Sequence, residues 1–131
     1  MGVAWGYVVV AIGGGIGSGL RHAANRAGLA LIGPNFPAGT LFVNVVGSAL
    51  IGLFAGWFAF RGETASADLR LFLATGICGG FTTFSSFSLD AVLLWQRGDH
   101  LLCAGYVVAS FAGAILGLMA GLALMRTVLA A

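Results

Sequence analysis

The chain has 131 residues, of which 60% are hydrophobic and 8% are charged, and its mean hydropathy is +1.03. A water-soluble domain carries roughly a quarter charged residues, so this composition excludes a soluble globule and intrinsic disorder. The six basic residues are all arginine and form no run, which argues against a nucleic-acid-binding protein.

The charged residues leave four long uncharged gaps in the chain. The gaps lie before Arg21, between Arg26 and Arg61, between Arg70 and Asp90, and between Asp99 and Arg126. Each gap reaches the length of about 19 residues that an α-helix needs to cross roughly 30 Å of hydrocarbon. The sequence therefore predicts an all-α membrane protein that forms a single transmembrane domain over residues 1–131.

Four transmembrane helices are predicted, over Val3–Leu20, Ala38–Phe60, Leu71–Gln96 and Leu101–Met125. The first apolar run has no basic region ahead of it and no persuasive cleavage site, so we expect a retained helix and not a signal peptide. Short connections join the helices: a turn with Pro34 and Pro37, a loop over Arg61–Arg70, and a turn over Arg97–His100. Four crossings place both termini on the same side of the membrane.

Glycine occurs 22 times and recurs at a spacing of four residues. The recurring sets are Gly13/Gly17, Gly15/Gly19, Gly52/Gly56 and Gly113/Gly117/Gly121. Small residues four apart let helix backbones approach closely in a membrane. We expect tightly packed helices without a wide aqueous lumen, so any permeant is small.

The second helix carries a polar stripe, because Thr40, Asn44 and Ser48 are four residues apart. Asn44 is the informative member, since its amide offers two hydrogen-bond donors and no charge. Two interpretations stay open at this point: Asn44 lines a pathway for a permeant, or it bonds one helix to another.

The third helix is predicted to be broken within residues 76–88 (GICGGFTTFSSFS), which combine glycines, threonines and serines in the middle of a membrane segment. A break frees backbone carbonyls and amides that protein groups or an ion must then satisfy. The alternative is a kinked helix whose hydroxyls bond back to the preceding turn. Phe84 and Phe87 can face the same way and hold an anion with their positive ring edges, or they simply pack.

The fourth helix adds two hydroxyl donors four residues apart, Tyr106 and Ser110. The two cysteines, Cys78 and Cys103, stand alone in apolar runs without metal-ligand spacing, so we expect buried thiols.

The arginines are divided evenly between the two sides of the predicted bundle. The side with the termini and the second loop carries Arg61, Arg70 and Arg126, and the opposite side carries Arg21, Arg26 and Arg97. The positive-inside rule then favours neither orientation. The chain can insert both ways, which would let two opposed copies pair about an axis in the membrane plane; alternatively, local effects fix one orientation.

Several function classes lack their chemistry in this chain. A proton-coupled small multidrug exporter needs an embedded carboxylate, normally in its first helix, but no acidic residue precedes Glu63 and Asp90 lies near the end of a span. No nucleophile–base pair and no His/Cys cluster is present, so we do not expect an enzyme. Neutral donors and ring edges along a narrow path favour a small anion as permeant, with the exporter and a purely structural membrane protein as alternatives.

Three motifs of the sequence carry a resemblance to a known family. They are residues 13–21 (GGGIGSGLR), 39–47 (GTLFVNVVG) and 76–88 (GICGGFTTFSSFS). With these motifs the chain resembles the Fluc (CrcB) family of bacterial fluoride channels over essentially its whole length. The third motif is the most specific of the three.

The resemblance implies an antiparallel, dual-topology homodimer with two narrow pores, which exports fluoride passively across the bacterial cytoplasmic membrane. It implies fluoride contacts at Asn44, Phe84, Phe87, Tyr106 and Ser110, with Thr40 in the same polar stripe. Arg21 matches the arginine of a positively charged vestibule. Gly79 and Thr82 match the positions whose backbone carbonyls hold a structural sodium ion at the twofold axis.

The chain departs from the family pattern at three positions. Ser86 stands where the family often has threonine, and Asp90 stands where a glutamate is usual. Ala114 stands where some members carry a further serine, so the row of hydroxyls on the fourth helix is shorter here.

Overall fold

The computed structural model describes residues 2–62 and 66–131, and every regular element within them is a helix. The elements are α1 (Val3–Ile32), α2 (Ala38–Arg61), α3 (Ala67–Arg70), the π-helical η2 (Leu71–Cys78), α4 (Gly79–Phe81), α5 (Phe84–Gln96) and α6 (His100–Ala130). In this described part, α1, α2, the run Ala67–Gln96 and α6 are each long and apolar enough to cross a membrane. The chain is an all-helical, multi-pass membrane protein, as predicted.

Two helices are longer than the apolar runs that indicated them. α1 continues past Leu20 to Ile32, and α6 continues past Met125 to Ala130. The reason is that hydropathy marks where charged residues begin, whereas residues such as arginine and alanine continue a helix readily. α1 ends at Gly33, whose φ of 95° suits glycine, and Pro34 follows.

The loop expected over Arg61–Arg70 is partly helical, because α3 begins within it at Ala67. Ser66 caps this helix: its side-chain oxygen accepts a hydrogen bond from the Leu69 N–H at 3.1 Å. Asp68 lies in the first turn, where a carboxylate complements the helix dipole. Glu63 lies outside the described residues.

The third helical run changes conformation between Phe81 and Phe84. Thr82 and Thr83 are extended, with ψ angles of 158° and 120°. The Thr82 N–H still donates to the Cys78 carbonyl, and the Thr83 hydroxyl caps α5 by accepting from the Ser86 N–H. Hydroxyls also bond back one turn, from Thr82 to the Cys78 carbonyl and from Ser88 to the Phe84 carbonyl. Extended residues and hydroxyls that bond back to the preceding turn therefore occur side by side in this segment.

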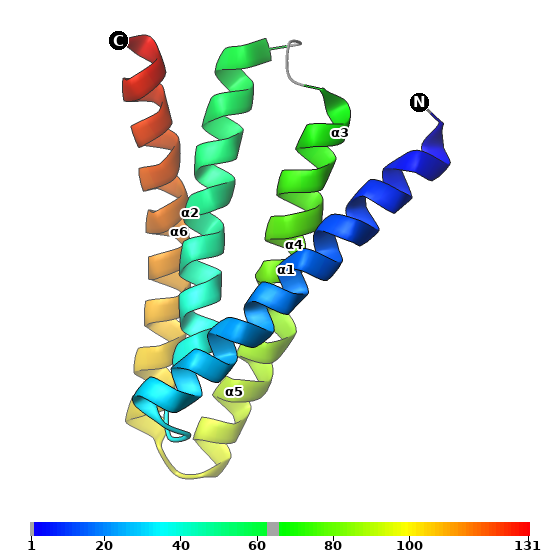
Figure 1. Ribbon diagram of the computed structural model, residues 1–131. Helices are drawn as coiled ribbons and strands as arrows, with labels where there is room; N and C mark the ends of the chain where they lie inside the picture. Colours follow the sequence, from blue (N-terminus) through cyan, green and yellow to red (C-terminus); the bar gives the residue numbers. More distant parts are fainter. Residues whose placement is uncertain (1, 63–65) are drawn as a thin grey trace.

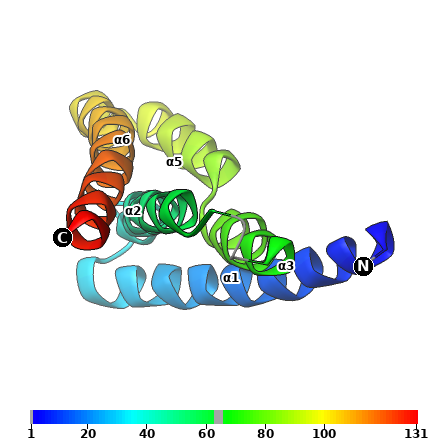
Figure 2. The same ribbon diagram turned by 90° about the horizontal axis from the view of Figure 1, so that it is seen from above.

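Both termini lie at the same end of the bundle, and α1 crosses the other helices obliquely (Figure 1). Seen from above, α2 lies in the middle, with α1 along one side and α5 and α6 along the other (Figure 2). α2 packs mainly on α6, and α1 packs mainly on η2 and α4.

Glycines make these two helix contacts close. A Cβ atom on Gly13 would lie 2.8 Å from the Phe72 carbonyl oxygen, and one on Gly52 would meet the Leu118 carbonyl. By contrast, a Cβ on Gly15 or Gly19 would have no neighbour within 4 Å in this chain. Three of the four glycine sets thus serve packing within the chain, while the Gly15/Gly19 face is free.

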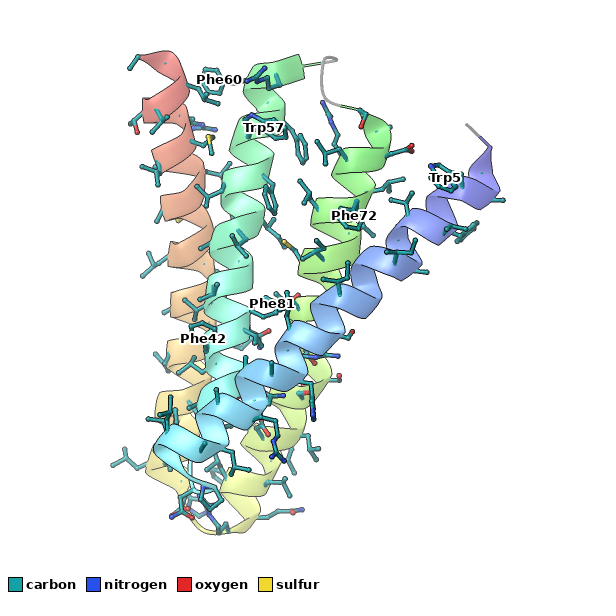
Figure 3. The ribbon with its side chains drawn as sticks, in the orientation of Figure 1. Trp5, Phe42, Trp57, Phe60, Phe72 and Phe81 are labelled. Atoms are coloured by element: carbon teal, nitrogen blue, oxygen red, sulfur yellow. The ribbon has the colours of Figure 1, made fainter. Side chains whose placement is uncertain are left out.

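Aromatic side chains mark one end of the bundle. Trp5, Trp57 and Phe60 lie toward the end that carries both termini, whereas Phe81 lies about midway (Figure 3). The Trp5 indole N–H donates to the Asp68 carboxylate at 2.9 Å, which ties α1 to α3. Tryptophan is enriched at membrane–water interfaces, so the extended residues next to Phe81 lie at membrane depth.

Candidate functional site

Asn44 on α2 takes over the backbone hydrogen bonds of the extended segment. Its Nδ2 donates to the Thr83 carbonyl at 2.9 Å, and its Oδ1 accepts from the Thr83 N–H at 2.7 Å. A continuous helix would pair the Thr83 N–H with a carbonyl four residues earlier. Asn44 therefore holds the segment in its extended form, and one N–H of its amide is left for another acceptor.

Two side chains from α1 hold the neighbouring carbonyls. The Arg21 guanidinium donates to the Thr82 carbonyl at 3.3 Å, and the Ser18 hydroxyl donates to the Gly80 carbonyl at 3.4 Å. Side chains of the same chain thus hydrogen-bond both backbone amides and backbone carbonyls of this segment. The sequence suggested a vestibule for Arg21; in the structure its guanidinium lies against Thr82.

A central cavity of about 250 Å³ opens beside the extended segment, between α2, α5 and α6. Every residue that lines it is uncharged. The lining consists of Asn44, Ser48, Thr82, Thr83, Phe84, Phe87, Ser110, Phe111, Ala114 and Ile115. Four of the residues predicted to contact an ion, Asn44, Phe84, Phe87 and Ser110, therefore share one cavity.

Phe87 is the best fixed ring of this cavity. It is buried, and its ring centre lies 5.5 Å from that of Phe84, 5.4 Å from that of Tyr106 and 5.6 Å from that of Phe111. The Phe111 ring stands nearly perpendicular to it, at 85°. Phe84 differs, because 70% of its surface is exposed on the single chain. The Phe87 ring is thus packed among its neighbours, whereas the Phe84 ring is exposed on the single chain.

Ser110 offers a hydroxyl without a partner. Its Oγ is buried and makes no hydrogen bond to any residue that the structure describes. A buried hydroxyl that lacks a partner costs roughly 1–3 kcal/mol, so the site favours a ligand or water that accepts from it. This unsatisfied donor faces the same cavity as the free N–H of Asn44.

Tyr106 packs between a ring of the central cavity and a ring of a second cavity. Its side chain is only 1% exposed and packs between Phe87 of the central cavity and Phe36, whose ring meets it edge-on at 5.8 Å. Its hydroxyl donates to the Asp90 carboxylate at 3.1 Å, and the Thr40 and Ser110 side chains lie near the same hydroxyl, Ser110 without a hydrogen bond to it. Tyr106 therefore ties α6 to α5 next to both cavities.

The second space, the end cavity, has about 400 Å³ and lies at the α1–α2 turn. Thr40 and Asp90 line it together with Asn25, Phe36, Ser86 and Arg97, among others. The Arg97 guanidinium donates to the Asn35 carbonyl and to the Asp99 carboxylate, so it is already paired. The end cavity thus carries both charge signs, unlike the central cavity.

The structure also supplies what the sequence could not indicate. Thr83 had no assigned role, because its partner Asn44 lies 39 residues away on another helix. Phe111 had none either, although its place next to Ser110 on α6 was a usable signal. Among the described residues, no group of three His, Cys, Asp or Glu side chains could hold a metal ion.

Comparison with known proteins identifies the family. The family model described as CrcB-like protein, Camphor Resistance (CrcB), matches residues 8–122. A Mesorhizobium japonicum protein named fluoride-specific ion channel FluC is 53% identical over 120 residues, which cover 92% of this chain and 95% of that protein.

Two further relatives carry the same name. The Rhodopseudomonas palustris protein is 53% identical over 122 residues, covering 93% of this chain and 98% of the relative. The Agrobacterium fabrum protein is 55% identical over 118 residues, covering 90% and 94%. The resemblance carried by the three sequence motifs is confirmed: the chain belongs to the CrcB family.

Proposed function

We propose that this chain is a fluoride-selective ion channel that lets fluoride leave the cell passively across the bacterial cytoplasmic membrane. One observation carries the proposal: the central cavity is lined only by uncharged residues, among them the unpartnered Ser110 hydroxyl, the Asn44 amide and phenylalanine rings. Relatives that are 53% identical bear the name fluoride-specific ion channel.

The chemistry of the cavity suits a small, strongly hydrated anion. A selective pore must replace the water around the ion with close donors, yet must release the ion again. Neutral donors such as Ser110 and Asn44 meet both needs, since a fixed arginine at the same place would hold the anion too firmly. Phe87 adds a positive ring edge that needs no hydrogen bond of its own.

The path of the ion follows from the two cavities. Fluoride enters the end cavity, passes the hydroxyls of Thr40 and Tyr106, and reaches Ser110 and Asn44 in the central cavity. The Tyr106 ring packs against Phe87 of the central cavity and Phe36 of the end cavity, so we expect its side chain to shift as the ion passes. Arg21, near the start of the extended segment, adds positive charge that attracts anions.

The proton-coupled exporter receives no support. α1 contains no acidic residue, and the Asp90 carboxylate accepts a hydrogen bond from Tyr106. Movement of protons driven by a cationic drug, measured in vesicles that contain the protein, would revive that alternative.

We propose further that two chains pair in opposite orientations and that each pore uses residues of both. The exposed ring of Phe84, the free Gly15/Gly19 face and the even division of arginines support this arrangement. Cysteine introduced at His100, at the exposed start of α6, is expected to react with a membrane-impermeant reagent from both sides of the membrane. Labelling from one side alone would contradict dual topology; the native thiols Cys78 and Cys103 are buried.

The proposed dimer includes a structural sodium ion, for which backbone carbonyls of Gly79 and Thr82 are suitable ligands. The Gly79 carbonyl lacks its helical partner, because the Thr83 N–H goes to Asn44, and Thr82 keeps a second lone pair beside the one that Arg21 uses. Two carbonyls from one chain are too few, so the site needs both copies. The bound ion would satisfy the lone pairs of these carbonyl oxygens. Equal fluoride efflux when sodium is replaced by N-methylglucamine would argue against the sodium ion.

Fluoride efflux from liposomes tests the channel itself. Purified protein is reconstituted into vesicles loaded with potassium fluoride, and a fluoride electrode records efflux after valinomycin is added. We expect rapid efflux that depends on both the protein and valinomycin. Vesicles that keep their fluoride would contradict the proposed function.

A further inference from the structure

The serine at the end of the polar stripe on α2 faces the central cavity. Ser48 follows Asn44 by four residues, so both side chains lie on one face of the helix, and both line the cavity. Nothing above assigns Ser48 a role.

The packing of α2 on α6 fixes the height of Ser48 in the bundle. Val45 and Ala49 flank it on α2, and both lie against Gly117 of α6. Ser48 therefore stands near the level of Gly117, about one turn beyond Ala114, which lines the same cavity. Neither Ala114 nor Gly117 has a polar side chain, so this part of α6 contributes no side-chain donor.

The hydroxyl of Ser48 is not used by its own helix. A serine within a helix commonly bonds back to a carbonyl one turn earlier, as Ser88 does here with the Phe84 carbonyl. Within the described residues Ser48 makes no such bond. Its side chain is half-buried and lines the cavity. Its O–H is therefore free to donate into the cavity.

We infer that Ser48 is a further ion-contacting residue, whose hydroxyl extends the row of neutral donors one turn beyond Asn44, where α6 has no side-chain donor. The inference rests on the proposed fluoride channel, and it concerns the same small anion. The ion passes from Ser110 and Asn44 to Ser48 as it leaves the central cavity, so that it is never left without a close donor.

A pair of substitutions tests this assignment. Ser48→Ala is expected to slow fluoride efflux from liposomes about tenfold, the effect of losing one hydrogen bond to a charged group. Adding Ala114→Ser to Ser48→Ala returns a hydroxyl to the same cavity, about one turn from Ser48, and is expected to restore part of the rate. Thr127→Ala, which removes a hydroxyl near the end of α6 and away from both cavities, is the matched control and should leave efflux unchanged.

The outcomes separate this inference from the proposed function. If the unmodified protein passes fluoride and Ser48→Ala is equally fast, the role of Ser48 is refuted while the channel stands. A double variant that is folded and as slow as Ser48→Ala would also refute it, because a restored hydroxyl would then not matter. If the unmodified protein passes no fluoride, the channel itself fails.

Discussion

Replacing Asn44 by aspartate is expected to reduce fluoride efflux by about a hundredfold or more. The substitution keeps the shape of the side chain but places a negative charge beside the central cavity. Two unit charges about 4 Å apart repel by about 4 kcal/mol at an effective dielectric constant of about 20. Each factor of ten in rate corresponds to about 1.4 kcal/mol, so a hundredfold loss corresponds to about 2.8 kcal/mol, which is less than the repulsion energy.

The same substitution also disturbs the extended segment. Asn44 donates to the Thr83 carbonyl and accepts from the Thr83 N–H, and an ionised aspartate can only accept. One carboxylate oxygen would then face the Thr83 carbonyl oxygen without a proton between them. Loss of this bond displaces Thr83 and Phe84, both of which line the cavity.

Efflux from liposomes at pH 7 measures the effect, and Gln96→Glu is the matched control. That substitution makes the same amide-to-carboxylate change on the exposed end of α5, outside both cavities. We expect it to leave efflux within about twofold of the unmodified protein, as for an exposed site screened by solvent. A folded Asn44→Asp variant with undiminished efflux would remove Asn44 from the ion path.

Replacing Gly17 by alanine is expected to destabilise the protein by about 3 kcal/mol, the upper range for overpacking a tight contact. The added Cβ would meet the Ile77 carbonyl oxygen and lie 2.8 Å from the Phe81 N atom. Both neighbours are backbone atoms, which cannot rotate away as a side chain can. α1 must therefore move outward, and Ser18 and Arg21 then lose their hold on the Gly80 and Thr82 carbonyls.

Unfolding in detergent, followed by helix content against added dodecyl sulfate, gives the change in the free energy of unfolding. Gly105→Ala serves as control, because a Cβ on Gly105 would have no neighbour within 4 Å. An alanine there should leave stability unchanged or raise it by up to about 1 kcal/mol. Equal stabilities of the Gly17→Ala and Gly105→Ala variants would show that the α1–η2 contact is looser than the structure has it.

The membrane-spanning segments could be predicted from the sequence because charges are so costly in hydrocarbon that their positions outline the spans. The ends of α1 could not, since a helix continues through Arg21 and Arg26 until Gly33 and Pro34 stop it. Of the polar stripe on α2, Asn44 and Ser48 line the central cavity, whereas Thr40 lines the end cavity.

Partners across helices were beyond the reach of the sequence. Nothing local indicates that the Asn44 amide bonds the backbone of Thr83, or that the Tyr106 hydroxyl bonds Asp90, 16 residues away on a different helix. These pairs arise from the tertiary packing of α2, α5 and α6, which the spacing of polar residues along one helix does not encode. Two-chain features, the antiparallel pair and its sodium ion, remain predictions for the same reason.

The cavity of neutral donors is expected to select fluoride over chloride, and a comparison of the efflux of these two halides measures this selectivity directly. Vesicles that contain the purified protein are loaded with equal concentrations of potassium fluoride and potassium chloride, and both anions are followed after valinomycin is added. We expect fluoride to leave at least about a hundredfold faster than chloride, a difference of about 3 kcal/mol in barrier height. Equal rates for the two halides would contradict the account.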